Sequence, residues 1–331
     1  MTQTTLHVPS NFHLPELEID EKHKQKVQQM LDQTNQENAP FFWENGFSKS
    51  FDVPVDDGKI RVYHIKPKNI VSKRPLVFVP GWGGFKEHFH DYYKSLHNKA
   101  ELYYVETREK NSSKLNKNAK MNMHQKAKDI QDVINYFKLK NKDFILHGTC
   151  WGSAIILQGL IENSLEAPTI IAHDPMHTLW FPKWILKYVA PVLPTFLVKL
   201  MKPFFQWMQL RGMKEKVQRE RAEYFIKYAD VGKWKKTAIA VKDFELFGNL
   251  SGIEKTVFVT NGTVDKVHEQ LNYPKIAKEL PNGRFIYMET DEAQREKLMG
   301  LIALEFSKIS MDEDIPQSLK EFEKDLNSNK K

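Results

Sequence analysis

Residues 147–152, His-Gly-Thr-Cys-Trp-Gly, contain the residue types of a nucleophilic site. They hold a Gly-x-Cys-x-Gly pattern between a run typical of a buried strand and a run typical of a helix. A nucleophile on a sharp strand-to-helix turn sits in strained backbone, and small residues two positions before and after it avoid clashes. The amino end of the next helix then favours a thiolate and stabilises an oxyanion. Cys150 is therefore the candidate nucleophile; the alternative is a buried structural thiol.

Strands and helices alternate on both sides of this motif. We expect strands at 76–79, 100–105, 143–147, 169–172, 256–259 and 284–288, and helices at 121–138, 151–162, 271–280 and 292–309. A hairpin with an Asp-Gly turn is expected at 51–63. This alternation predicts an α/β fold in which helices cover both faces of a mostly parallel sheet.

The 331 residues divide by composition into four parts. These are an N-terminal arm at 1–45, a core at 46–174 and 251–309, a helical cap inserted at 175–250, and a charged tail at 310–331. The arm is predicted to contain a helix around 20–33, and a packed arm and a loosely attached leader are equally favoured. We expect the tail to be frayed.

Several separate motifs resemble, in order, those of the α/β-hydrolase superfamily over about residues 50–309. Pro80-Gly81-Trp82 stands where the family has the His-Gly-x loop, and 106–112 loosely resembles its Asp-x-Arg-Gly-x-Gly-x-Ser run. Asp129 fits the acidic position on the helix before the elbow, and 261–265 follows the next-to-last strand, where Gly-x-x-Asp supplies the triad acid. The resemblance implies an α/β-hydrolase fold with an inserted helical cap.

The same resemblance implies roles for individual residues. The amides of Trp82 and Trp151 would form the oxyanion hole, and Asp265 would be the triad acid. Cys150 replaces the common serine, as in dienelactone hydrolases and polyhydroxyalkanoate synthases, whose elbows also carry cysteine. A thiolate is intrinsically the better nucleophile and suits thioesters or activated acyl groups.

The expected histidine after the last strand is missing. Residues 288–296 contain none, and Gln294 stands nearest the family's position. Glutamine has no titratable proton near neutral pH, so it cannot act as general base. Other histidines are candidates for this role, although a surface or structural role is favoured for each: His147 before the elbow, His173 and His177 flanking Asp174, and His268 three residues after Asp265.

Two functions follow from these residues. The first is an acyl hydrolase or acyltransferase that uses Cys150 on an ester or thioester with a hydrophobic acyl group. The alternative is a catalytically inactive binding or interaction protein on a hydrolase scaffold, since the triad histidine is missing. A third alternative is an altered residue at 150 or 294 that disables turnover.

Composition limits the partners. The net charge of +7 is mild and spread out, so no nucleic-acid partner is implied. A single cysteine excludes an internal disulfide and a multi-cysteine metal cluster, and no ligand cluster or dinucleotide fingerprint implies a metal or cofactor. No apolar run has the length of a signal peptide or membrane span, so a cytoplasmic protein is expected. The cap's aromatics at 180–207, interleaved with lysines, favour packing and an apolar substrate pocket over contact with a membrane surface.

Overall fold

The computed structural model describes residues 20–34, 37–44, 46–67, 70–211, 216–263 and 272–326. Within these residues one sheet has the strand order β1-β2-β4-β3-β6-β7-β8-β9-β10, and β5 pairs with β2. The strands are β1 (Lys49–Val55), β2 (Gly58–Ile65), β3 (Leu76–Val79), β4 (Leu102–Glu106), β5 (Lys114–Leu115), β6 (Ile145–Thr149), β7 (Thr169–His173), β8 (Val257–Asn261), β9 (Gly283–Tyr287) and β10 (Glu323–Lys324).

The centre of the sheet is parallel. Strands β4, β3, β6, β7, β8 and β9 run in one direction, and the β1–β2 hairpin and β10 add antiparallel edges. Every residue of β3, β4, β6, β7 and β8 is buried, which explains their nearly continuous apolar sequences. The predicted α/β fold with a mostly parallel sheet is confirmed.

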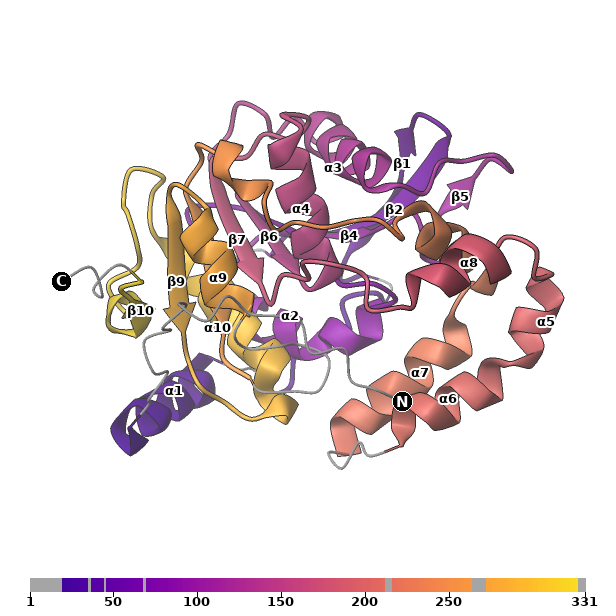
Figure 1. Cartoon of the computed structure of the whole chain (residues 1–331). Helices are drawn as coiled ribbons and strands as arrows, with labels where there is room; N and C mark the ends of the chain where they lie inside the picture. Colours follow the sequence, from indigo (N-terminus) through magenta and orange to yellow (C-terminus); the bar gives the residue numbers. More distant parts are fainter. Residues whose placement is uncertain are drawn as a thin grey trace.

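Helices cover both faces of this sheet (Figure 1). One core cluster includes α3 (Met123–Tyr136), α4 (Trp151–Ile161) and α9 (Asn272–Glu279). The other includes α1 (Glu21–Thr34), α2 (His90–Leu96) and α10 (Arg295–Lys308). Short 3₁₀ or π turns complete the elements: η1 (Lys86–Phe89), η2 (Ile185–Val189), η3 (Leu250–Gly252), η4 (Glu292–Gln294) and η5 (Lys320–Phe322).

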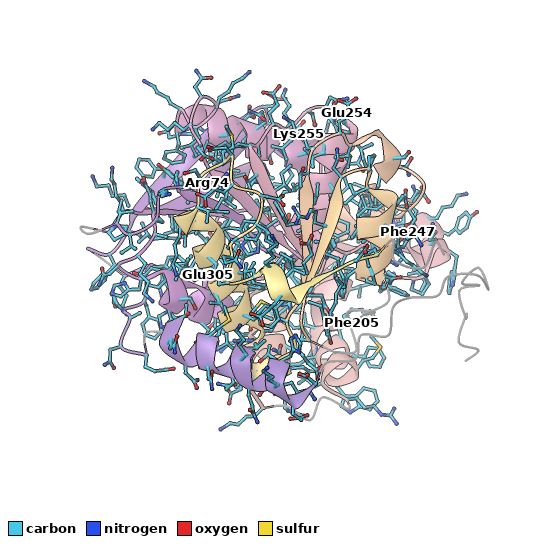
Figure 2. The ribbon with its side chains drawn as sticks, turned by 90° about the vertical axis from the view of Figure 1, so that its left-hand side faces the viewer. Arg74, Phe205, Phe247, Glu254, Lys255 and Glu305 are labelled. Carbon is cyan, nitrogen blue, oxygen red and sulfur yellow. The ribbon has the colours of Figure 1, made fainter. Side chains whose placement is uncertain are left out.

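The two ends of the described chain pack against the core. In α1, Val27 and Leu31 are buried among the residues of the second cluster, as a packed arm requires. The expectation of a frayed tail is wrong for 310–326, because Leu319 and Phe322 are buried and β10 pairs with β9. Figure 2 shows the molecule from this edge of the sheet. Helix α2 was not expected from the sequence, because with seven residues it is too short to show a clear helical pattern.

Residues 175–250 lie between β7 and β8 and hold η2, α5 (Thr195–Leu200), α6 (Lys202–Leu210), α7 (Lys216–Tyr228) and α8 (Val231–Ala240); we refer to them as the cap. Helices α7 and α8 contact the loop after β3: a Cβ built on Gly83 would overlap the rings of Phe225 and Trp234. Helices α5 and α6 form the outer edge of the cap, away from the sheet (Figure 1). None of the described helices is long and apolar enough to cross a membrane.

Candidate active site

Cys150 lies on the sharp turn between β6 and α4. Its backbone has φ of +52° and ψ of −114°, a conformation that strains a residue with a side chain. Its amide donates to the carbonyl of His173 at 2.9 Å, and its own carbonyl accepts from the amide of Met176 at 3.3 Å. A Cβ on Gly152 would lie 2.0 Å from the carbonyl oxygen of Val79, so the elbow requires glycine there. The turn thus holds a half-buried thiol at the amino end of α4.

Trp82 and Trp151 flank this thiol. A Cβ built on Gly81 would lie 3.1 Å from the Cys150 Cβ, so the loop that carries Trp82 lies against the elbow. Trp151 is the first residue of α4, where helix amides lack intrahelical acceptors. Neither tryptophan amide donates to a backbone carbonyl within the described part of the chain. The structure therefore brings the proposed nucleophile and both proposed oxyanion donors together.

Gln294, the position nearest the family's histidine, does not join this group. Asp265 and His268 fall outside the described residues. The Gln294 side chain donates to Gln28 Oε1 of α1 at 2.8 Å and to Asp291 Oδ2 at 3.3 Å. These contacts direct Gln294 toward α1 rather than toward Cys150.

Arg295, the next residue along, reaches the elbow instead. Its Nη2 donates to Thr149 Oγ1 at 3.2 Å, directly before Cys150. Its Nε donates at 2.7 Å to Asp174, a fully buried carboxylate just after β7 that also accepts from Asn261 Nδ2 at 2.5 Å. A guanidinium does not release its proton, so Arg295 cannot act as a base. It forms a buried ion pair beneath the elbow.

The histidines considered from the sequence have partners other than the thiol. The three described ones are buried, and each Nδ1 lies near another polar side chain: His147 at 3.2 Å from the Tyr92 hydroxyl, His173 at 2.8 Å from Thr260 Oγ1, and His177 at 3.0 Å from Glu245 Oε1. Burial holds the pKa of His147 well below its ordinary value, so that ring is neutral near pH 7. These contacts fit structural histidines.

A buried lysine lies on the other side of the elbow. Lys110, in the loop after β4, donates from Nζ to the Gly81 carbonyl at 2.7 Å. A Cβ built on Gly81 would lie 3.5 Å from Cys150 Sγ, so Gly81 contacts both the Lys110 amine and the region of the thiol. Burial lowers the pKa of Lys110 to about 8, although Glu109, Glu106 and a Cys150 thiolate favour its charged form. The sequence did not indicate that Lys110 lies close to the elbow, although Lys110 falls within the 106–112 run.

Two buried ion pairs fix the loop that carries Lys110. Arg108 binds Asp129 of α3 through two bonds, of 2.7 and 2.6 Å. Glu109 pairs with Lys126, also of α3, and lies 3.8 Å from Lys110. Burial alone would raise the pKa of Glu109, but the charges of Lys126 and Lys110 hold it at about 2. These ion pairs therefore hold the Lys110 amine in a fixed position near the elbow.

The cap reinforces this support and carries a separate groove. From α8, Lys233 Nζ donates to the carbonyls of Lys110 and Ser113, each at 2.7 Å.

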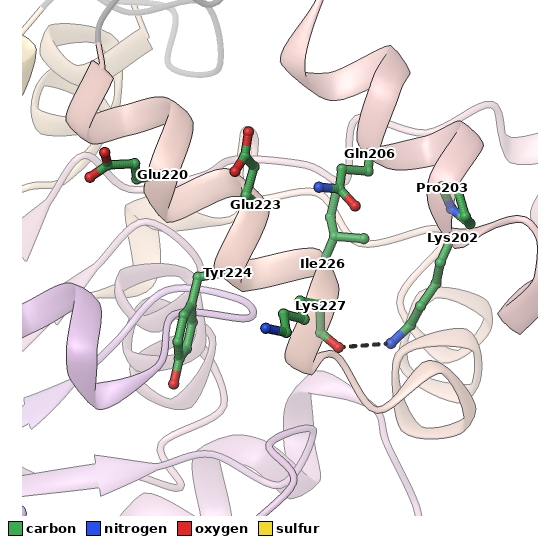
Figure 3. A pocket seen from close by; sticks show the side chains of 8 residues that line it. All are labelled: Lys202, Pro203, Gln206, Glu220, Glu223, Tyr224, Ile226 and Lys227. Carbon is green, nitrogen blue, oxygen red and sulfur yellow. Dashed lines mark hydrogen bonds between the residues drawn. The ribbon is translucent and has the colours of Figure 1, made fainter.

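The groove lies between α6 and α7, has a volume of about 480 Å³ and does not include Cys150 (Figure 3). Its lining mixes charges of both signs: Lys202, Pro203, Gln206, Glu220, Glu223, Tyr224, Ile226 and Lys227. Such a lining does not suit an acyl chain.

A metal-assisted reaction would need a cluster of ligands. Among the residues that the structure describes, no group of three or more His, Cys, Asp or Glu side chains is arranged to hold a metal ion.

The fold has many structural relatives, whereas no family model matches the chain and no curated protein matches its sequence. A hydrolase from Pseudomonas aeruginosa PA01 is similar with a TM-score of 0.61 and 13% identity, over 78% of this chain and 98% of that one. An esterase from Exiguobacterium antarcticum has a TM-score of 0.59 and 19% identity, over 76% and 96%. An α/β hydrolase from Sphaerobacter thermophilus has a TM-score of 0.58 and 11% identity, over 78% and 99%. The chain thus has the α/β-hydrolase fold. Sequence identities this low do not show that the chain shares the activities of these proteins.

Proposed function

We propose that the protein is an acyl hydrolase or acyltransferase in which Cys150 takes an acyl group from a thioester or activated ester. The observation that carries this proposal is the strained backbone of Cys150, at φ of +52°, beside the amides of Trp82 and Trp151. Backbone strain of this kind persists where a side chain must be presented in a fixed place. An inert buried thiol would need neither the strain nor the two adjoining amides.

The chemistry assigns each group one task. The Lys110 amine accepts the thiol proton, and the sulfur of Cys150 attacks the acyl carbonyl carbon. The amides of Trp82 and Trp151 donate to the resulting oxyanion. As the carbonyl re-forms, the bond to the leaving thiolate or alkoxide breaks, and that group takes the proton from the Lys110 ammonium. Cys150 is left as an acyl thioester.

The second half of the reaction decides between hydrolysis and transfer. Water or an acceptor thiol or alcohol attacks the acyl thioester, gives its proton to the Lys110 amine, and releases Cys150. A poised imidazole normally activates a weak nucleophile such as water. Arg295 keeps its proton and occupies Asp174 in an ion pair, so the Lys110 amine must activate the water without a histidine. We therefore expect deacylation by water to be the slow step.

Aromatic residues in and next to the core cluster against which Cys150 packs support an apolar acyl group. The rings of Trp82 and Trp151 have centroids 5.2 Å apart. Trp234 of α8 lies 6.2 Å from Trp82, and Phe244 lies 5.4 Å from Trp151. Apolar walls with few polar groups are typical of sites for hydrophobic ligands.

The second candidate is a binding protein without catalysis. The Arg295–Asp174 pair favours it, because a paired cation bonds Thr149 of the elbow from the residue next to the position where the resemblance implies a histidine. In that case the elbow would bind an acyl compound without forming a covalent bond.

Intact-protein mass spectrometry separates the two candidates. The protein is incubated with p-nitrophenyl esters and acyl thioesters of several chain lengths, with Cys150→Ala as the control. We expect an acyl adduct that requires Cys150 and accumulates, because its hydrolysis is slow. Turnover without accumulation would show that an efficient base exists. If neither adduct nor turnover appears at any chain length, the catalytic proposal fails and the binding protein remains.

A further inference from the structure

The outer face of the cap exposes a regular series of large apolar side chains. More than half of each side chain's surface is accessible, and successive members are four residues apart: Trp184 (62%), Tyr188 (64%), Val192 (78%), Phe196 (61%), Leu200 (72%), Phe204 (53%) and Met208 (51%). Packing inside the cap, which the sequence favours, does not account for them. Many exposed large apolar side chains in one short segment of a protein mark a binding surface.

Helix α6 shows how the face arises. Phe204, Trp207 and Met208 follow the spacing of one helix side, and all three are exposed. Lys202 Nζ, at the start of the helix, donates to the carbonyls of Lys227 and Ala229 at 3.2 and 3.0 Å, which fastens α6 to the end of α7. The helix therefore packs against the cap while its apolar stripe faces outward. Ordinary surface helices have the reverse arrangement.

The charge of the same segment is entirely positive. Residues 175–211 contain no aspartate or glutamate and five basic residues: Lys183, Lys187, Lys199, Lys202 and Arg211. Cations lie directly over exposed rings, with Lys187 Nζ 5.3 Å from the Tyr188 centroid and Arg211 5.4 Å from Trp207. The segment therefore carries a net charge of +5 against +7 for the whole chain, so the expectation that the positive charge is spread out along the sequence does not hold for the cap.

We propose that the outer face of the cap, formed by residues 180–211, binds the surface of an anionic lipid bilayer. Tryptophan and tyrosine rings prefer the boundary between headgroups and acyl chains, and lysines beside them bind lipid phosphates. The absence of acidic residues from 175–211 complements a negatively charged surface. No described helix is long enough to cross the bilayer, so η2, α5 and α6 lie along its surface.

Helices α5 and α6 lie at the periphery of the molecule (Figure 1). Helices α5 and α6 run along the edge of the molecule opposite α1 and β10. The groove of Figure 3 lies on the other side of α6, between it and α7, so its glutamates are not part of the outer stripe. The surface and the elbow are separate, and bilayer binding does not depend on acyl chemistry. Cys150→Ala is expected to bind lipid as the parent does.

The test is flotation of the full chain with large unilamellar vesicles. One set is made of phosphatidylcholine alone and the other of equal parts phosphatidylcholine and phosphatidylglycerol. We expect flotation with the anionic vesicles, with a partition constant at least about tenfold above that for the neutral ones. Raising the salt from about 0.05 to about 0.5 M should weaken binding several-fold, since the Debye length shrinks. Tryptophan emission should shift to shorter wavelength on binding.

Variants show which face binds. Trp184→Ser combined with Trp207→Ser should lower the partition constant at least about tenfold, and so should Lys183→Glu combined with Lys187→Glu. Tyr136→Ser is the control, because Tyr136 is an exposed aromatic (47%) on α3, outside the cap. Thermal unfolding followed by circular dichroism checks that each variant folds.

Three outcomes would overturn the proposal. The first is no flotation with either vesicle, and the second is equal binding to neutral and anionic vesicles. The third is an equal loss of binding in Tyr136→Ser and in the paired tryptophan variant. Light scattering adds a specific alternative: if the parent self-associates without lipid and the paired tryptophan variant does not, the face is a contact between protein chains.

Discussion

The loop beside the elbow and the outer face of the cap distribute their side chains in opposite ways. Residues 108–110 place three charged side chains where at most 2% of their surface is accessible. The cap places eight large apolar side chains, Trp207 included, where more than half of each is accessible. Both arrangements are unfavourable in themselves: the first removes charges from water, and the second leaves apolar surface in it.

The difference lies in how each cost is offset. Every charge in the loop has a partner: Asp129 for Arg108, Lys126 for Glu109, and the Gly81 carbonyl for Lys110. The loop is therefore complete as it stands and can support a rigid site. In the isolated protein the exposed apolar side chains of the cap are in contact with water. The cost of that exposure would be offset if a ligand bound there and removed them from water.

Glu109→Gln should produce the largest effect on stability. It removes the carboxylate that pairs with the buried Lys126 and lies 3.8 Å from Lys110, and breaking a buried ion pair typically costs about 3–5 kcal/mol. The measurement is urea unfolding at pH 7. Glu321→Gln is the matched control, because Glu321 pairs with Lys26 at the surface, where a pair contributes about 0–1 kcal/mol. A loss below 1 kcal/mol for Glu109→Gln would show that the loop does not depend on its paired charges.

Acid should weaken the parent through the same carboxylate. The pKa of Glu109 is about 2 in the folded chain, against an ordinary value of 4.5. Its stabilisation is therefore fully present above about pH 4.5 and is lost as the pH falls through about 2. The difference corresponds to roughly 3 kcal/mol. Urea unfolding between pH 2 and 5 measures it, and Glu109→Gln should lose less stability over this window than the parent.

Lys110→Met should slow acylation of Cys150 by about 100-fold, at the lower end of what proton transfer contributes. Stopped-flow release of p-nitrophenol from an activated ester gives the rate. Small primary amines added to the solution should restore part of the rate in this variant, since they supply the missing proton acceptor. Lys126→Met is the control: it alters the same buried cluster but leaves the Lys110–Gly81 contact in place. Equal losses in the two variants, without rescue by amines, would reduce Lys110 to a structural group.

Local patterns made the elbow predictable. The proposed nucleophile, its glycines and the first helical amide all lie within 147–152. The strands are short apolar runs because both faces of the sheet are covered. Lys110 and Arg295 could not be assigned in this way. Lys110 bonds a carbonyl 29 residues away, and Arg295 bonds a side chain 146 residues away. Such contacts depend on how distant segments pack.

The cap shows a second limit of the sequence. Aromatic residues at helical spacing identify a stripe but not the side of the molecule it faces, because the same period suits a core and a surface. Proline residues divide 180–208 into short helices, and the sequence does not fix how each helix is oriented relative to the next. Only the packing of α6 on α7 and of α5 on α8 fixes the stripe outward.

The smallest expected effect tests that orientation directly. Trp184→Ala should change the free energy of unfolding by no more than about 0.5 kcal/mol, because an exposed side chain loses few contacts. Trp151→Ala, which empties a fully buried position in the same chain, should cost about 3–5 kcal/mol. Urea unfolding in lipid-free buffer compares the two. A loss above about 2 kcal/mol for Trp184→Ala would mean that the ring is packed in the free protein, and the outer face would then need no ligand to explain it.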